Sequence, residues 1–136
     1  MADARYIQAL KQAYFLELLG ESTYQQGSCK LRDDLASTWA AFASTEIEMQ
    51  RLLSEELQRV TGAWQPSQAV IHLARGIGHL AGVLSPTLLG RIIKRVLDRR
   101  RYTQWAAQFS SRNPQLWQAL VEHEVRQTDH FEGRGT

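Results

Sequence analysis

Carboxylates fall at inward-facing positions of three predicted helices, and they are the residues of this sequence that could carry chemistry. Glu17 and Glu21 lie on the apolar stripe of one helix, Glu46 on that of a second and Glu124 on that of a third. A carboxylate at a core position is costly unless it meets a cation, a metal or a proton. The pattern therefore predicts a shared polar centre. The alternative is that the registers are off by one residue and the glutamates are partly exposed.

Metal binding is one chemistry that such a centre could support. Ferritin-like di-iron proteins use a glutamate from each of two helices and a Glu-x-x-His pair from each of two others, which places both ligands of a pair on one helix face. The candidate ligands here are Glu17, Glu46, Glu124, Gln127 and His130. Two registers stay open on the last helix: Glu124 with Gln127 lacks the histidine, and Gln127 with His130 lacks the glutamate.

Capping signals and apolar spacing predict the helices that must position these residues. We expect helices over about 3–26 and from a cap at Asp33 or Asp34 to about residue 60. A third helix over about 69–109 is interrupted at Ser85-Pro86, where a cap followed by proline starts a second piece, and Asn113-Pro114 starts the last helix. The sequence thus predicts an all-α, ferritin-like four-helix bundle of up-down type. We expect one domain over residues 1–136, with a frayed tail at 132–136.

Composition limits the class of protein. The 136-residue chain is 43% hydrophobic and 22% charged, as expected of a folded protein, and its net charge of +2 gives no argument for a nucleic-acid partner. One cysteine, Cys29, excludes an internal disulfide and indicates a reducing cytoplasm. No signal peptide is expected, because charged residues interrupt the N-terminus. The longest uncharged stretch, Gly76–Gly90, is too short to span a bilayer.

Several short segments, in order along the chain, resemble those of one known family. Glu17 is followed seven residues later by Tyr24, which opens the segment Tyr-Gln-Gln-Gly, and Glu46–Met49 lies at the place of a Glu-x-x-His pair. The glycine-rich segment Gly76–Ser85, followed by Leu89-Gly90, is the best match. Together these segments resemble the demethoxyubiquinone hydroxylases, which are ferritin-like di-iron enzymes of ubiquinone biosynthesis that act at the membrane surface.

The chain departs from this family at ligand positions. Met49 replaces the histidine of the second helix, and the ligand position of the third falls at Arg95 or Val96. An arginine there would repel a dication and pair with the remaining carboxylates. The resemblance therefore implies a degenerate site, in which Arg95 forms a core ion pair with Glu17 and Glu46 or with Glu124.

A basic cluster follows the uncharged stretch, and together they predict a surface for lipid. Apolar side chains would enter the acyl boundary and the arginines would meet anionic headgroups, and the resemblance implies the same role. The alternative is a solvated helix face beside an ordinary piece of core. The residues concerned are Leu80, Val83, Leu84, Leu88, Arg91, Lys94, Arg99, Arg100 and Arg101.

These observations predict a hydroxylase-like protein that is not catalytic. It is expected to need no cofactor and to bind a quinone or another prenyl-type lipid at the cytoplasmic face of the membrane, or a partner subunit. The first alternative is an active di-iron hydroxylase that carries two irons and acts on a hydrophobic quinone-like substrate. The second is a helical interaction module without a small ligand. A homodimer is expected if the apolar stretches exceed what one small bundle can bury.

Overall fold

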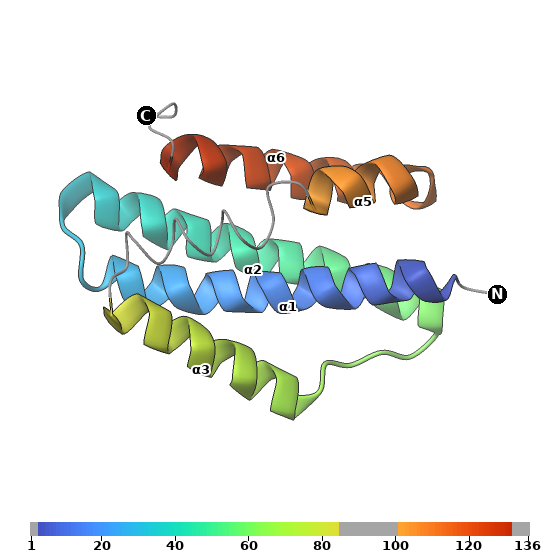
Figure 1. The fold of residues 1–136 in the computed structure, drawn as a ribbon, viewed down its shortest axis with the longest axis horizontal. Coiled ribbons are helices and arrows are strands. Elements are labelled where there is room, and N and C mark those ends of the chain that lie inside the picture. The colour runs from blue at the N-terminus through green and yellow to red at the C-terminus, as the bar shows by residue number, and fades with distance from the viewer. Residues whose placement is uncertain (1–2, 85–100, 132–136) are drawn as a thin grey trace. The chain divides into compact units, whose positions relative to one another are not determined.

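The computed structural model describes residues 3–84 and 101–131, and the regular structure within these ranges is helical throughout. The all-α prediction is confirmed for this part of the chain. The contacts divide the chain into two compact units, Met1–Gly90 and Arg91–Thr136. The helices of the first unit are α1 (Ala4–Ser28), α2 (Asp33–Thr61) and α3 (Gln68–Leu84); those of the second are α5 (Arg101–Phe109), the 3-10 turn η1 (Ser110–Arg112) and α6 (Pro114–Phe131) (Figure 1).

In the first unit, α1 and α2 form an antiparallel hairpin that keeps one register along its length. Tyr24 packs edge-on against Trp39 near the turn, with ring centroids 5.1 Å apart. At the far end of the hairpin, the Tyr6 hydroxyl donates to the Glu56 carboxylate. Apolar residues at steps of three and four are buried between these points, as the amphipathic pattern predicts. The largest of them are Leu10, Leu18, Leu53 and Leu57.

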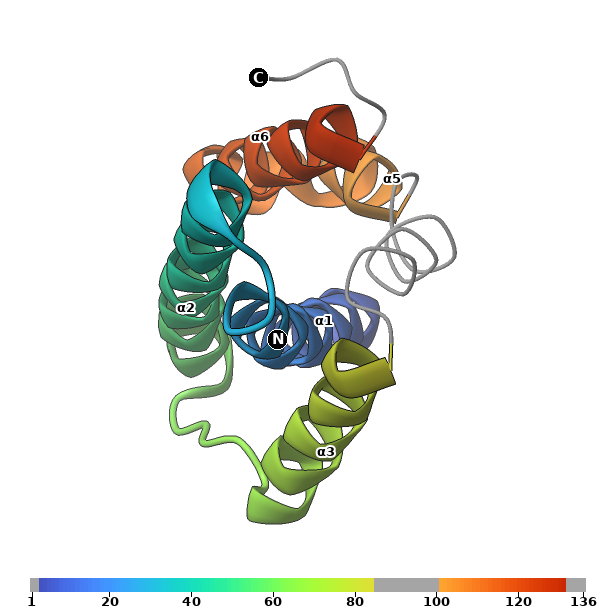
Figure 2. The ribbon, with the colours of Figure 1, turned by 90° about the vertical axis from the view of Figure 1, so that its left-hand side faces the viewer.

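The third helix of this unit packs against α1 on a different side from α2 (Figure 2). Trp64, just before α3, lies edge-on to Tyr14 at 5.0 Å, and further along the Ser22 hydroxyl donates to the backbone oxygen of Arg75 at 2.9 Å. Gly78 allows this close approach, because a Cβ there would lie 2.6 Å from that of Ser22. These contacts show that α3 runs in the same direction as α1.

Both links between helices of the first unit are short. The turn after α1 occupies residues 29–32, and residues 62–67 join α2 to α3. Gly62 closes α2 with φ of 87°, a left-handed conformation that favours glycine. A ferritin-like fold contains one long crossover connection. Because both links are short and α3 runs in the same direction as α1, the described helices of this unit have an up-down-up arrangement. This is a coarser statement than the predicted ferritin-like bundle.

The second unit is held together by aromatic side chains of α5 and α6. Trp117 lies 6.3 Å from both Trp105 and Phe109, measured between ring centroids. The predicted start of the last helix is confirmed, because the Asn113 side-chain oxygen accepts a hydrogen bond from the Leu116 amide at 3.2 Å and the helix begins at Pro114.

Two predicted helix boundaries are wrong. The N-cap of α2 is Arg32, which makes no side-chain capping bond, and the helix already includes Asp33. An aspartate in the first turn also favours a helix start, through the helix dipole, without being the cap. The prediction therefore took Asp33 or Asp34 for the cap and placed it too late in the sequence. The first helix also continues through Gly27 to Ser28. The predicted interruption at Ser85-Pro86 lies outside the described residues.

Candidate functional site

Glu17 and Glu46 form a buried pair between α1 and α2. Each side chain belongs to a residue that is only 1% exposed, and a carboxylate oxygen of one lies within 4.8 Å of a carboxylate oxygen of the other. The register of the hairpin produces this pairing, because both residues lie on the facing stripes of their helices. The structure therefore brings together two of the residues that the sequence predicts for a polar centre.

A glycine makes room for this pair. Gly20 lies one turn beyond Glu17 on α1, and a Cβ at Gly20 would lie only 2.5 Å from Oε1 and 3.0 Å from Oε2 of Glu46. The Glu46 carboxylate thus lies against the backbone of α1 in space that any other residue would fill. We call this space the Gly20 notch.

Glu21, the other acid of the α1 stripe, has a different environment. Its carboxylate accepts a hydrogen bond from the side-chain amide of Gln50 at 2.8 Å and from that of Gln25 at 3.3 Å. Burial raises the pKa of the neighbouring Tyr14 phenol, Arg75 opposes this rise and Glu21 adds to it. Two neutral amides therefore fix the position of the Glu21 carboxylate.

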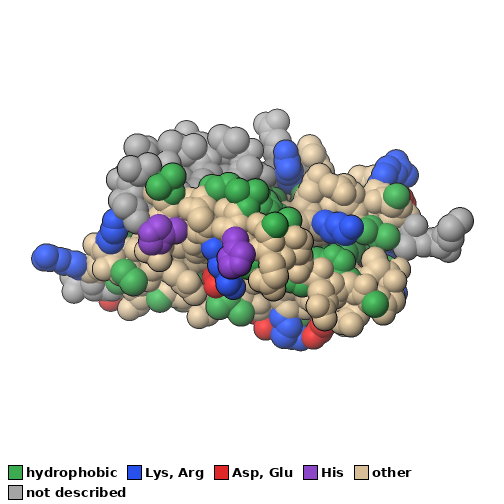
Figure 3. Space-filling model, turned by 90° about the horizontal axis from the view of Figure 1, so that it is seen from below, with side chains coloured by type: hydrophobic (Ala, Val, Ile, Leu, Met, Phe, Trp, Pro, Cys, Tyr) green, Lys and Arg blue, Asp and Glu red, His purple; other side chains and the backbone are tan. Residues whose placement is uncertain are grey.

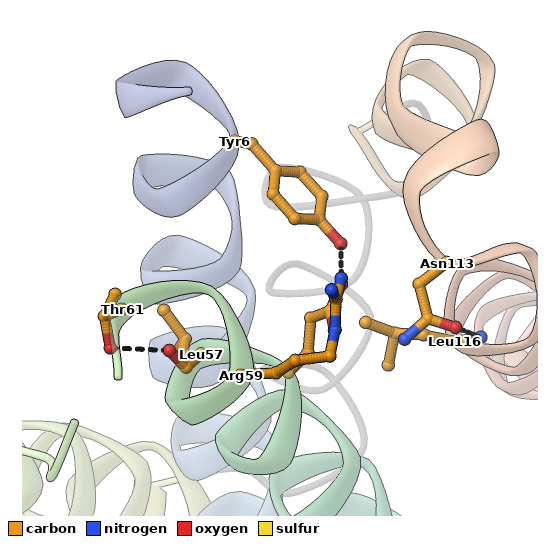
Figure 4. Close-up of polar contacts among 7 residues, drawn as sticks. Tyr6, Leu57, Arg59, Thr61, Asn113 and Leu116 are labelled. Carbon is orange, nitrogen blue, oxygen red and sulfur yellow. Dashed lines mark hydrogen bonds and ion pairs between the residues drawn. The ribbon is translucent and has the colours of Figure 1, made fainter. Parts of the chain in front are cut away.

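Sequence reasoning missed one buried acid, Glu56. Arg59 donates to it through Nε at 2.6 Å and through a second guanidinium nitrogen at 2.8 Å, while Tyr6 donates from α1. Figure 4 shows the Tyr6 hydroxyl pointing toward the Arg59 side chain. Glu55 and Glu56 are adjacent in a charged stretch, so neither stands out as a core residue. The available signal was Arg59 at the i+3 position, which can pair with Glu56 on one helix face.

In the second unit, α6 carries a buried row of polar side chains. Glu124 is 2% exposed and Gln127 is fully buried, whereas His130 is partly exposed. His123, which the sequence analysis does not include among the ligands, is also buried, and its Nε2 lies 2.9 Å from the side-chain nitrogen of Gln127. Its position four residues before Gln127 was the signal that could have identified it.

The donor atoms of the first unit fit a divalent cation better than a complete di-iron centre. Carboxylate oxygens are ligands for Mg²⁺, Mn²⁺ and Fe²⁺. The position three residues after Glu46 is occupied by Met49, which is buried and whose soft thioether is a poor ligand for these ions. The predicted ion-pair partner Arg95 lies outside the described residues.

The third helix presents an uncovered apolar face. Val70, Leu73, Ile77 and Leu80 follow one another at steps of three and four and are 39%, 58%, 44% and 61% exposed. We call them the α3 stripe. Histidine and hydrophobic side chains share the surface on this side of the molecule (Figure 3). No described helix has the length and apolarity needed to cross a membrane.

The structure describes only part of the predicted lipid surface. Leu80 belongs to the α3 stripe, and Arg101 is exposed at the start of α5. The backbone of Val83 and Leu84 is helical, but their side chains lie outside the described part. The other predicted residues fall outside the described ranges altogether: Leu88, Arg91, Lys94, Arg99 and Arg100.

Comparison with known proteins gives no match: no family model, curated protein or solved structure is similar to this chain.

Proposed function

We propose that this chain is a helical protein of the demethoxyubiquinone hydroxylase type, with a reduced metal site, that docks on an anionic membrane and takes up a quinone or another prenyl-type lipid. The ferritin-like fold belongs to this proposal. The α3 stripe is the observation that carries it. Monomeric proteins rarely leave a continuous apolar row on the surface, and such rows usually mark an interaction site.

The charge of α3 favours lipid as the occupant of this face. The helix contains no aspartate or glutamate, and its one charged residue is Arg75, accompanied by His72 and His79. In the sequence, six basic residues follow between positions 91 and 101. An apolar stripe on a helix without acidic residues, followed in the sequence by a basic segment with a single aspartate, Asp98, has the chemistry of an interfacial element. Each lysine or arginine near an anionic surface adds about 1 kcal/mol.

Vesicle flotation tests the docking proposal. We expect the protein to float with vesicles containing phosphatidylglycerol and to bind less well to pure phosphatidylcholine or at high salt. The double substitution Leu73→Ser and Leu80→Ser should weaken binding at least tenfold, because each leucine contributes about 1.5–3 kcal/mol when it is buried in the membrane. Quinone uptake can be followed in the same vesicles as quenching of tryptophan fluorescence by a prenyl quinone.

The second helix offers a matched control. Leu35 and Ile47 are 40% and 47% exposed on α2, so Leu35→Ser with Ile47→Ser removes a similar apolar surface from another helix. This control should still float. Equal loss of flotation in both double variants would contradict the proposal. A wild-type dimer that does not float and that Leu73→Ser with Leu80→Ser dissociates would assign the face to a second copy of the chain.

Divalent-cation binding is a second candidate function, favoured by the buried Glu17–Glu46 pair and the Gly20 notch. Iron held there would supply oxygen activation, as in the alternative of an active di-iron hydroxylase. Glu17 and Glu46 would hold it in the first unit, and Glu124, Gln127 and His130 remain predicted ligands of the second.

Anaerobic loading with Fe(II), followed by elemental analysis, distinguishes a reduced metal site from an active di-iron centre. About two irons per chain, lost in Glu46→Ala and in Glu124→Ala, would overturn the reduced-site proposal and indicate an oxygen-activating enzyme. At most one weakly bound ion is the result expected of a reduced site. If Arg95 pairs with the carboxylates, Arg95→Ala should increase the amount of bound metal.

A further inference from the structure

The contact between Gly20 and Glu46 joins two helices at the point where the carboxylate pair lies. A Cβ at position 20 would approach Oε1, Cδ and Oε2 of Glu46 to 2.5, 2.7 and 3.0 Å. All three atoms belong to the far end of a flexible side chain. A side chain at position 20 would therefore move the carboxylate and leave the helix backbones where they are.

A comparison with Gly76 and Gly78, two glycines of α3, shows that this arrangement is particular to Gly20. At Gly76 a Cβ would meet nothing within 4 Å. At Gly78 it would meet the Ser22 Cβ at 2.6 Å and the backbone oxygen of Leu19 at 2.8 Å, so that glycine serves helix packing. Among these three glycines, Gly20 alone borders a carboxylate.

We propose that Gly20 is a positioning residue: because it has no side chain, the Glu46 carboxylate can lie beside Glu17 in the geometry that receives a cation. This inference deepens the second candidate function and rests on it for the identity of the bound ion. The claim that Gly20 positions the Glu46 carboxylate does not depend on a bound metal and can be tested without one.

Cation affinity is the first test, with Mn²⁺ as the probe and its EPR signal as the readout. We expect Gly20→Ala to weaken Mn²⁺ binding at least tenfold, as Glu46→Gln should, because the carboxylate no longer lies beside Glu17. Gly76→Ala is the matched control, since it makes the same change in a helix with open space around it, and it should leave the affinity unchanged. Equal Mn²⁺ affinity in Gly20→Ala and wild type would overturn the proposal.

The second test needs no metal. Alanine is the better helix former, so Gly76→Ala should raise Tm. Gly20→Ala should raise Tm by a similar amount only in the Glu46→Ala background, where no carboxylate occupies the notch. In the presence of Glu46 the increase should be smaller or reversed. Equal Tm shifts in the two backgrounds would show that Gly20 does not constrain Glu46.

The two tests keep the proposals apart. If the wild type binds no Mn²⁺, the cation-binding function is wrong, and the metal-free comparison alone decides whether Gly20 positions Glu46. If the wild type binds Mn²⁺ and the Gly20→Ala variant binds it equally well, the cation-binding function stands and the role of Gly20 is wrong.

Discussion

At the scale of single residues, the buried acids of α1 and α2 fall into separate environments. Glu21 accepts hydrogen bonds from two amides, Glu56 is held by a tyrosine and an arginine, and Glu17 and Glu46 lie close together beside the Gly20 notch. Hydrogen bonds from neutral or cationic donors compensate the burial of a carboxylate. The Glu17–Glu46 pair brings two carboxylates close together, and the proposed cation site rests on this arrangement.

The hydrogen bond between Tyr6 and Glu56 should contribute measurably to stability. Tyr6 is fully buried and its hydroxyl donates to a carboxylate that is itself buried. Hydrogen bonds to charged groups contribute about 1.5–3 kcal/mol, so Tyr6→Phe should lower the free energy of unfolding in urea by about that amount. Tyr14→Phe, at a half-buried position of the same helix, should change it much less. Unfolding of Tyr6→Phe at the wild-type urea concentration would contradict this assignment.

Sequence periodicity predicted the inward placement of Glu17 and Glu46, because a stripe at steps of three and four defines a helix face. The same pattern predicted a shared polar centre. The exact pairing of Glu17 with Glu46 across the hairpin and the Gly20 notch could not be predicted, because both depend on how α1 and α2 are aligned. That alignment is set by packing between residues far apart in sequence. Glu56 was missed because its charged neighbours in sequence resemble a solvated face, although Tyr6 and Arg59 hold it in the core.

At the scale of elements, helix termini differ in how they are secured. The start of α6 has a side-chain cap from Asn113, whereas the start of α2 has none from Arg32. The Asn-Pro signal predicted the start of α6 correctly because cap and proline act locally. The start of α2 was misplaced by an acidic pair whose effect on a helix is less specific.

Removal of the α6 cap should weaken the first turn of that helix. Asn113→Ala leaves the Leu116 amide without its side-chain acceptor and should cost about 1 kcal/mol. Hydrogen exchange at the Leu116 amide should then be faster, while Asn113→Asp, which keeps an acceptor oxygen, should protect it. Unchanged exchange in Asn113→Ala would mean that the cap contributes nothing to the stability of α6.

At the scale of the whole molecule, the question is whether the two compact units unfold together. The second unit is a short segment, Arg91–Thr136, and segments of this size rarely form a stable core alone. The sequence predicts one domain. We therefore expect cooperative unfolding of the whole chain.

Hydrogen exchange at increasing denaturant can measure this cooperativity. Peptides from α1, α2 and α6 should lose protection at the same denaturant concentration. Loss of protection in α6 before α1 and α2 would show that the units are separate domains and that the one-domain prediction is wrong.

The constant register of the α1–α2 hairpin has a consequence for changes in chain length. Deletion of one residue from α2 between Glu46 and Glu56 would rotate the rest of the helix by about 100°. The deletion would separate Glu56 from Tyr6 while Trp39 still faced Tyr24. Substitutions on the outer faces of these helices should therefore be tolerated far more readily than insertions or deletions. Length variation among descendants of this sequence should be confined to the links at residues 29–32 and 62–67.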